Sequence, residues 1–405
     1  MPIPSTVAPT CTSRAAIKLL AFPDAHNGLG IAYSQLGDAE RARAEFDEAI
    51  RIDAGYAPAY NSRGGLSFTA KEYDRAIADY DEAIRLDPNY TIAYHNRGLA
   101  YAAKEDYDHA IADYSDAIRL DPLYAVAFDN RGDAYRAKQD HEHAIADYSE
   151  AIRIRPDYAV AYNDRGEIYR EQGDGEHALA DLNEAIRIDP ALARAYNNRG
   201  NLYLGNGDYE HALAHLNEAI RIDPAFASAY DNRGTVYLNV GDYTHALADL
   251  DEAIRLDPNQ GWSGVRGLVH FYAANYGASA ADLSAVLPTT GDPARVMLWR
   301  YLARAHSAGA EAGPELEANA KNLKPADWPY ALVEMFLGSR TPDAALAAAT
   351  NPSQVCEARF YAGEWRLLHG DRAAATDDFK TAVDTCPKTF VERAGAEAEL
   401  KRLAP

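Results

Sequence analysis

Apolar and small residues recur along the chain at the spacing of paired amphipathic helices. Residues 91–103 predict a first helix whose buried face carries Ala93, Tyr94, Gly98 and Tyr101. Residues 107–120 predict a second helix with a buried stripe made of Ala110, Ile111, Tyr114, Ala117 and Ile118. Pro122 ends this helix, because proline cannot continue a helix interior. The pattern predicts a helical hairpin in which Gly98 and Ala110 allow a close approach.

The hairpin pattern repeats every 34 residues. A glycine marks the first helix of each copy, at Gly30, Gly64, Gly98, Gly132, Gly166, Gly200 and Gly234. A proline ends the second helix of all copies but the first, at Pro88, Pro122, Pro156, Pro190, Pro224 and Pro258. A period of this length is typical of a solenoid, in which neighbouring repeats bury a shared core. We predict seven regular repeats over residues 23–259.

The pattern changes on both sides of this array. Residues 1–22 form an N-terminal extension. Residues 260–350 predict a degenerate helical region, in which the spacing of the marker residues is lost. Residues 351–405 predict one more hairpin and then a terminal amphipathic helix. Such a helix covers the last apolar face, as a solenoid requires.

The residue series resembles the tetratricopeptide repeat (TPR). Its aromatic, glycine, alanine and proline markers occur in the third copy at Tyr94, Gly98, Tyr101, Ala110, Tyr114, Ala117 and Pro122. The resemblance covers all seven copies. It implies an all-α fold, a right-handed TPR superhelix of antiparallel helix pairs with a C-terminal capping helix. In such a superhelix the first helices line a concave groove.

The C-terminal part resembles a narrower family, the NlpI-type bacterial lipoproteins. The likeness extends over about residues 260–403 and rests on 298–303, Trp328, 333–338, 360–363, 370–371 and 390–392. It implies a periplasmic, lipid-anchored TPR adaptor for cell-wall hydrolases and a processing protease, without catalysis of its own. However, Cys11 does not follow the apolar segment that precedes a lipoprotein cysteine. Either the true start lies upstream of Met1, or the protein is not lipidated.

Charge narrows the class of partner. The 405 residues include 40 Lys and Arg against 61 Asp and Glu, a formal net charge of −21. Such a field disfavours nucleic acid and anionic lipid and favours basic or neutral protein partners. We expect no transmembrane segment, because no apolar run reaches about 18 residues. The N-terminus also lacks the basic start and apolar stretch of a signal peptide.

Polar residues occupy two groove positions in each first helix. The residue two before the motif glycine is Ser62, Asn96, Asn130, Asp164, Asn198 or Asn232. The residue before it is Asn61, His95, Asp129, Asn163, Asn197 or Asp231. Because a carboxamide both donates and accepts, a row of them can pair with an extended peptide. The row resembles the asparagine ladder of O-linked N-acetylglucosamine transferases. The alternative is that these side chains cap or bridge neighbouring repeats.

An arginine precedes the motif glycine in most copies, and an acid follows sixteen residues later. We predict structural ion pairs within each hairpin, at Arg97 with Asp113, Arg131 with Asp147, and Arg165 with Asp181. A buried guanidinium without a partner is costly, so a partner is required.

The sequence predicts no metal site, no cofactor and no enzyme activity. His109, His143, His177, His211 and His245 open successive second helices, one repeat apart, so they cannot converge on one metal ion. His211 and His215 share a helix face, but zinc needs further ligands. No phosphate-binding loop, nucleophile elbow or zinc-protease motif occurs.

Cys356 and Cys386 lie at the two ends of the last predicted hairpin. The ends of antiparallel helices are adjacent, so the two sulfurs can meet in a disulfide. A disulfide would indicate an oxidising compartment. The alternative is two buried thiols.

The sequence favours a protein-interaction adaptor or scaffold that binds peptide segments or partner helices in its groove, located in the periplasm. The alternative is a cytoplasmic scaffold or regulator that acts by self-association, for example as a homodimer.

Overall fold

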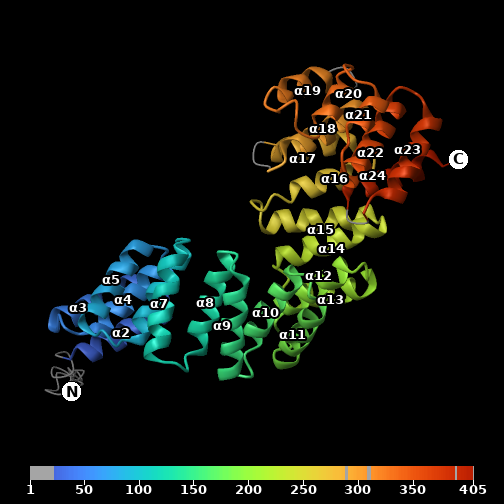
Figure 1. Ribbon diagram of the computed structural model, residues 1–405. Helices are drawn as coiled ribbons and strands as arrows, with labels where there is room; N and C mark the ends of the chain where they lie inside the picture. Colours follow the sequence, from blue (N-terminus) through green and yellow to red (C-terminus); the bar gives the residue numbers. More distant parts are fainter. Residues whose placement is uncertain (1–21, 288–290, 308–311, 388–389, 405) are drawn as a thin grey trace, which may run out of the picture. The chain divides into compact units, whose positions relative to one another are not determined.

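The computed structural model describes residues 22–287, 291–307, 312–387 and 390–404, and these residues form helices and no strand (Figure 1). The predicted all-α solenoid of antiparallel helix pairs is confirmed. The chain divides into two compact units, Met1–Pro190 and Ala191–Pro405. This boundary lies inside the array of regular repeats, because each repeat contacts only its neighbours and regularity of sequence does not define a compact unit. The boundary that we predict at residue 259 from the repeat pattern stays a prediction.

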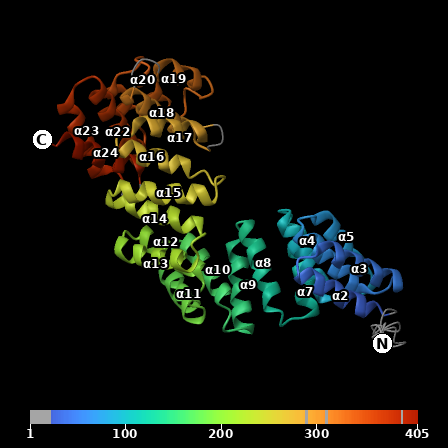
Figure 2. The ribbon, with the colours of Figure 1, turned by 180° about the vertical axis from the view of Figure 1, so that it is seen from behind.

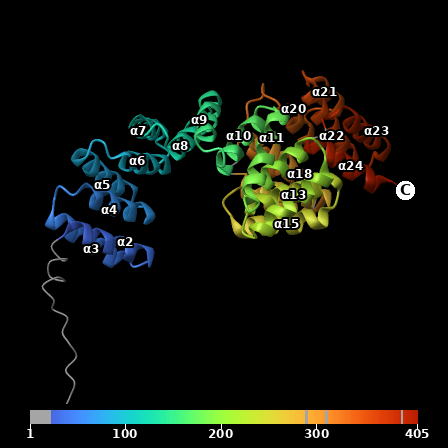
Figure 3. The same cartoon turned by 90° about the horizontal axis from the view of Figure 1, so that it is seen from below.

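Unit 1 consists of five helix pairs, apart from residues 1–21, which lie outside the described ranges with the predicted N-terminal extension. The pairs are α2 (Pro23–Gln35) with α3 (Ala39–Ile52), α4 (Ala57–Thr69) with α5 (Tyr73–Leu86), α6 (Thr91–Ala103) with α7 (Tyr107–Leu120), α8 (Ala125–Ala137) with α9 (His141–Ile154), and α10 (Ala159–Glu171) with α11 (Gly175–Ile188). Consecutive pairs lie side by side, as α2/α3 and α4/α5 show (Figures 1 and 3).

Unit 2 begins with two more regular pairs and continues with less regular helices. The regular pairs are α12 (Ala193–Gly205) with α13 (Tyr209–Ile222), and α14 (Ala227–Val240) with α15 (Tyr243–Leu256). The remaining helices are α16 (Ser263–Tyr272), α17 (Tyr276–Val286), α18 (Pro293–Ser307), α19 (Ala312–Ala320), α20 (Tyr330–Phe336), α21 (Pro342–Ala347), α22 (Pro352–Leu368), α23 (Arg372–Thr385) and α24 (Val391–Leu403).

The motif glycine allows the two helices of a hairpin to touch, and the second helix supplies one of two kinds of partner. In α8, a Cβ placed on Gly132 would lie 2.7 Å from a ring carbon of Tyr148. In α14, a Cβ placed on Gly234 would lie 3.3 Å from Leu250 Cγ. The hairpin of α8 and α9 therefore has no room for a methyl group at Gly132, whereas the hairpin of α14 and α15 has a little room at Gly234.

We expect Gly132→Ala to destabilise the protein by about 1–3 kcal/mol, because the added methyl overpacks the contact with Tyr148. The matched change Gly234→Ala should be neutral or slightly stabilising, because alanine is the better helix former by about 1 kcal/mol. Thermal unfolding followed by circular dichroism checks both variants. Equal losses of stability in the two variants would show that the contact with the Tyr148 ring is not the reason why position 132 requires glycine.

The second helices of most repeats start in the same way. The N-cap aspartate accepts a hydrogen bond from the backbone N–H three residues later, for example Asp140 from His143 at 3.3 Å. The His143 ring also pairs with the Asp140 carboxylate at 2.8 Å and stacks on Tyr135 of the first helix. The repeated histidines are thus exposed helix-start residues that tie the second helix to the first.

The C-terminal helices share one continuous core, unlike the thin layers between regular repeats. Trp299 of α18 is fully buried against Phe271 of α16 and Phe360 of α22. The last helix, α24, packs against α16, α22 and α23, and both views show it beside α16 and α22 (Figures 1 and 2). The Tyr272 hydroxyl donates to the backbone oxygen of Val391 at 2.8 Å. The predicted capping helix therefore closes back onto the first helix of this core.

Candidate functional site

The first helices of neighbouring repeats form one surface in each unit, which we call the first-helix face: α4, α6, α8 and α10 in unit 1, and α12 and α14 in unit 2. The predicted ladder residues lie on this face and bond to one another. The Nδ2 atoms of Asn96, Asn130 and Asn232 donate to Asn61 Oδ1 (3.0 Å), His95 Nε2 (2.8 Å) and Asn197 Oδ1 (2.9 Å), respectively. We call each such pair, between consecutive first helices, a rung.

The rungs favour the bridging interpretation of the ladder over direct peptide pairing. Each donor is half-buried, and one amide hydrogen is already used between repeats. Burial lowers the pKa of His95, which favours the neutral ring that can accept from Asn130. The buried Asn163 donates to Asp164 beside it at 2.9 Å, and the buried Asn197 donates to Asn198 at 3.4 Å.

One rung position in unit 1 holds two acids, Asp129 on α8 and Asp164 on α10. Asp129 is only 3 % exposed; its Oδ2 accepts from the Tyr158 hydroxyl at 2.9 Å, and its Oδ1 has no hydrogen-bond partner. Burial, and then the charges of Asp133 and Asp164, raise the pKa of Asp129 to about 7. In unit 2, burial also raises the pKa of Asp231 to about 6.

Charged residues surround this position on α8 and α10. Arg136 contacts Glu167 at 2.6 Å and Glu171 at 3.1 Å. Its guanidinium is therefore engaged by glutamates of the next repeat. Ion pairs therefore join α8 to α10 beside this position.

A hollow opens on the first-helix face of unit 2, one helical turn beyond the ladder. A cavity of about 340 Å³ lies between α12 and α14 and is lined by Asn201, Leu204, Gly205, Asn206, Gly207, Tyr209, Thr235 and Asn239. A second cavity, of about 230 Å³, shares Tyr209 and Asn239 with it and reaches Arg393 and Lys401 of α24. Sequence reasoning missed these residues, although Asn201 and Thr235 lie one turn after the ladder positions.

The three predicted arginine–aspartate pairs are in contact. Arg97, Arg131 and Arg165 each hold the acid of their own hairpin with two N–H groups, at distances of 2.6–2.8 Å. Arg63, Arg233 and Arg266 do the same with Asp79, Asp249 and Asp282. Each pair joins the first helix of a repeat to its second helix.

Sequence reasoning missed a further contact of these arginines. The remaining N–H group reaches back to the second helix of the preceding repeat. The acceptors are Asp47, Asp81, Ser115, Ser149, Asn217 and Asp251, contacted by Arg63, Arg97, Arg131, Arg165, Arg233 and Arg266 in that order. A polar residue sixteen positions before most of the arginines was the available signal. We call the arginine with both contacts a tie.

One repeat departs from this arrangement. Arg199 Nη2 donates to His215 Nδ1 at 3.1 Å, where other repeats have an aspartate. Burial, then the neighbouring Arg199, lower the pKa of His215 to about 4, so the ring is neutral at pH 7. His215 therefore serves as a neutral partner of the arginine.

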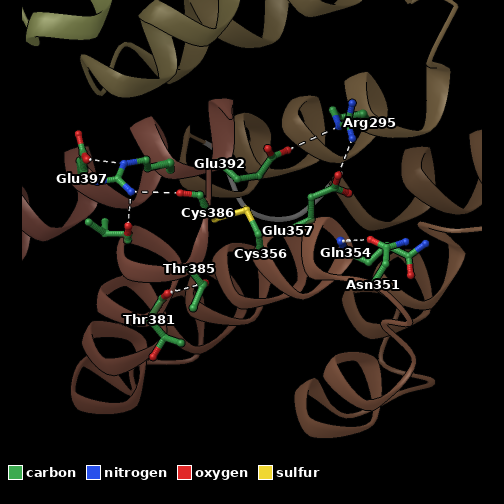
Figure 4. Close-up of a disulfide and its surroundings, with 12 residues drawn as sticks. Arg295, Asn351, Gln354, Cys356, Glu357, Thr381, Thr385, Cys386, Glu392 and Glu397 are labelled. Carbon is green, nitrogen blue, oxygen red and sulfur yellow. Dashed lines mark hydrogen bonds and ion pairs between the residues drawn. A yellow bond between two sulfur atoms is a disulfide. The ribbon is translucent and has the colours of Figure 1, made fainter. Parts of the chain in front are cut away.

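Cys356 and Cys386 form a disulfide, with the two sulfur atoms 2.06 Å apart (Figure 4). Cys386 ends α23, but Cys356 lies one turn inside α22, because Asn351 caps that helix and Pro352 begins it. Both cysteines are buried. The Arg393 guanidinium of α24 donates to the backbone oxygen of Cys386 at 3.1 Å, so the disulfide lies against the capping helix.

Two buried carboxyls lie beside the disulfide (Figure 4). Arg295 of α18 contacts Glu357 of α22 at 2.6 Å and Glu392 of α24 at 3.6 Å. The Trp328 indole N–H donates to Glu357 at 2.8 Å. Burial, and then the charge of Glu357, raise the pKa of Glu392 to about 7.

The stability of unit 2 should therefore depend on pH near neutrality. Because the folded-state pKa of Glu392 lies above its unfolded value, the folded state binds the extra proton, and stability falls as the pH rises through about 7. We expect Glu392→Gln to match the wild type near pH 5 and to exceed it by about 1–2 kcal/mol near pH 8. Urea unfolding at the two pH values checks this. A variant that loses equal stability at both would contradict it.

Among the described residues, no group of three or more histidine, cysteine or acidic side chains has an arrangement that could hold a metal ion. Within the same ranges, no helix has the length and apolarity needed to cross a membrane.

Comparison with known families finds the same repeat several times. Tetratricopeptide repeat models match residues 23–56, 91–124, 193–226 and 227–260, and a TPR repeat model matches residues 65–105, 132–173 and 166–207. Together these matches cover more than half of the chain. No curated protein matches the sequence.

Solved structures resemble the chain at low sequence identity. A tetratricopeptide repeat protein from Parabacteroides merdae has a TM-score of 0.51 and 18% identity, over 59% of this chain and 94% of that one. YrrB, described as a TPR protein with an unusual peptide-binding site, has a TM-score of 0.38 and 27% identity, over 45% of this chain and 95% of its own. PilF of Pseudomonas aeruginosa has a TM-score of 0.46 and 19% identity, over 53% and 97%. The first of these supports the fold alone.

Proposed function

Since the chain belongs to the tetratricopeptide repeat family, we propose that it is a non-catalytic adaptor that binds an extended segment of a partner protein on its first-helix face. The observation that carries this proposal is the hollow between α12 and α14. It combines the apolar Leu204 with polar groups at Asn201 and Asn239, a composition that suits an extended peptide. Its extension to Arg393 and Lys401 would let the segment contact the capping helix as well.

We further propose that the protein works in the bacterial cell envelope and recruits hydrolases or a processing protease there. The disulfide supports an oxidising compartment, because structural disulfides rarely persist in a reducing cytosol. The resemblance of residues 260–403 to NlpI-type lipoproteins points the same way and remains a prediction. A cytoplasmic scaffold that acts by self-association is the competing hypothesis.

A matched pair of variants tests the site. Thr235 lines the hollow, whereas Thr244 is exposed at the start of α15 and away from it. Thr235→Arg fills the hollow, and Thr244→Arg makes the same chemical change elsewhere. Partners that co-purify with the wild type should be lost with Thr235→Arg and retained with Thr244→Arg. An unchanged set of partners for Thr235→Arg would contradict the proposal.

A further inference from the structure

The second repeat lacks an aromatic residue that the other regular repeats have. The six other repeats carry a tyrosine three positions after the motif glycine, at Tyr33, Tyr101, Tyr135, Tyr169, Tyr203 and Tyr237. In the second repeat this residue is Ser67, which is fully buried in α4. Because serine is much smaller than tyrosine, the second repeat has less side-chain volume at this position.

The third repeat shows where the tyrosine ring lies. Tyr101 stacks on His109 of the second helix, with ring centroids 5.0 Å apart. Burial raises the pKa of its hydroxyl, and the charges of Arg97, Asp81 and Asp113 also act on that pKa. These three residues form one tie. The ring therefore lies beside the tie, between the second helix of its own repeat and that of the preceding repeat.

The corresponding place in the second repeat is a cavity, which we call the second-repeat cavity. It has a volume of about 320 Å³ and is lined by residues of α3, α4 and α5. Its lining includes Ser67 and the tie of this repeat, in which Arg63 contacts Asp47 and Asp79. Each member of that tie precedes its counterpart in the third repeat by 34 residues. The cavity therefore corresponds to the space that a tyrosine ring fills in the third repeat.

An arginine lines this cavity at the position where the first repeat places an arginine over the ring. In the first repeat, the Arg41 guanidinium lies over the Tyr33 ring, 5.2 Å from its centroid. Arg75 occupies the same position one repeat later, and it lines the second-repeat cavity together with Arg43. These two guanidinium groups contact Glu72 at 2.9 and 3.4 Å, and their side chains are 70% and 38% exposed. The rim of the cavity thus offers a guanidinium that can stack on an aromatic ring.

The aromatic residue next to Ser67 does not fill the cavity. Phe68 packs against Tyr73 of α5, with ring centroids 5.6 Å apart, and joins the apolar cluster of Ala76 and Tyr80. It is not among the residues that line the cavity. None of the residues outside the described ranges is aromatic, so those parts of the chain cannot supply the ring either.

We propose that the second-repeat cavity receives a tyrosine side chain of a partner protein. The ring takes the place that the motif tyrosine has in the other repeats, with the Arg75 guanidinium against its face. Its hydroxyl donates to a carboxylate of the tie, where Asp47 is 52% exposed. A phenylalanine ring would cover these polar groups without bonding to them, which costs free energy. This site lies in unit 1, apart from the hollow between α12 and α14, so the inference goes beyond the proposed function.

Three variants of the full-length protein test the cavity. Ser67→Tyr fills it from within with the residue of the six other regular repeats, so thermal unfolding followed by circular dichroism should show equal or higher stability. Ser34→Tyr makes the same change at an exposed residue of α2 and is the control. Arg75→Gln removes the guanidinium from the rim and should change stability little, because its ion pair with Glu72 is exposed.

A random peptide library is depleted on Ser67→Tyr and then selected on the wild type, so that the retained peptides require the cavity. We expect the retained peptides to share a tyrosine. Replacement of that tyrosine by leucine should weaken binding to the wild type and to Ser34→Tyr by at least about tenfold, and replacement by phenylalanine by about threefold. The unchanged peptides should bind Arg75→Gln about threefold more weakly and Thr235→Arg as tightly as the wild type.

Four results would overturn the inference and leave the adaptor proposal standing. The first is a selection that yields no peptide, and the second is a set of peptides without a shared tyrosine or unaffected by its replacement. The third is a loss of stability in Ser67→Tyr, because the cavity would then not be the place of the ring. The fourth is a loss of binding in Thr235→Arg, because the peptides would then occupy the hollow between α12 and α14.

Discussion

Loss of the Cys356–Cys386 disulfide should destabilise the C-terminal core by about 3–4 kcal/mol, the largest effect we expect. The bond closes a loop with a sequence separation of 30 residues, and in the chain-entropy account a loop of this size restricts the unfolded chain by about that amount. Helix α24 also packs against this core, so unfolding of the core should expose the apolar face that α24 covers. All four tryptophans, Trp262, Trp299, Trp328 and Trp365, lie in this part of the chain. Tryptophan fluorescence during urea unfolding therefore reports on it selectively.

The measurement compares Cys11→Ser protein, as the reference background, with and without a reducing agent. The same background with Cys356→Ala and Cys386→Ala should match the reduced protein and should not respond to reductant. An unfolding midpoint that stays the same after complete reduction would refute the prediction. Free thiols at both positions in protein taken from its native compartment would remove the main support for an envelope location.

The second large effect concerns the tie at Arg131. Arg131→Met leaves Asp147, which is 6% exposed, without its ion-pair partner, and we expect a loss of about 3 kcal/mol. Asp147→Asn should cost a similar amount, because the half-buried guanidinium of Arg131 loses its counter-charge. The double variant should cost clearly less than the sum, by about 1–3 kcal/mol, because the two side chains act as one unit.

An exposed pair of the same residue types provides the control. Arg119 and Asp116 are 3.0 Å apart on the surface of α7, with side chains 63% and 43% exposed, so their variants should change stability by less than about 1 kcal/mol. Circular dichroism during urea unfolding detects the loss in unit 1. Tryptophan fluorescence should remain unchanged, because no tryptophan lies in that unit. Strictly additive losses for Arg131 and Asp147 would show that the pair is not coupled.

Most of the fold could be predicted, because the repeat states the same local rule seven times. Each marker residue of the repeat acts through its shape. Glycine and alanine let the two helices touch, aromatic residues fill the space between them, and proline ends the second helix. The core of α16 to α24 could not be predicted in the same way. The contact between Tyr272 and Val391 joins residues 119 positions apart, and no local pattern specifies such a distant partner.

The site was predicted less completely than the fold. Spacing located the ladder residues and the pairs of Arg97, Arg131 and Arg165, because helical geometry fixes which residues share a face. Spacing could not show that the side-chain amides of Asn96 and Asn232 donate to the neighbouring repeat, because such a hydrogen bond depends on how closely the first helices approach. For the same reason, the hollow lined by Thr235 could not be predicted, because residues of both α12 and α14 form it.

The ties also bear on how such a chain can change length. Each tie of the seven regular repeats reaches sixteen residues forward and sixteen backward within a period of 34, so removal of one whole period keeps these contacts in register. If residues 97–130 were deleted, Arg131 would keep Asp147 and would meet Asp81 where Ser115 had been. A gene that encodes this array can therefore gain or lose whole repeats by recombination without leaving a buried charge unpaired, whereas a cut of half a period cannot.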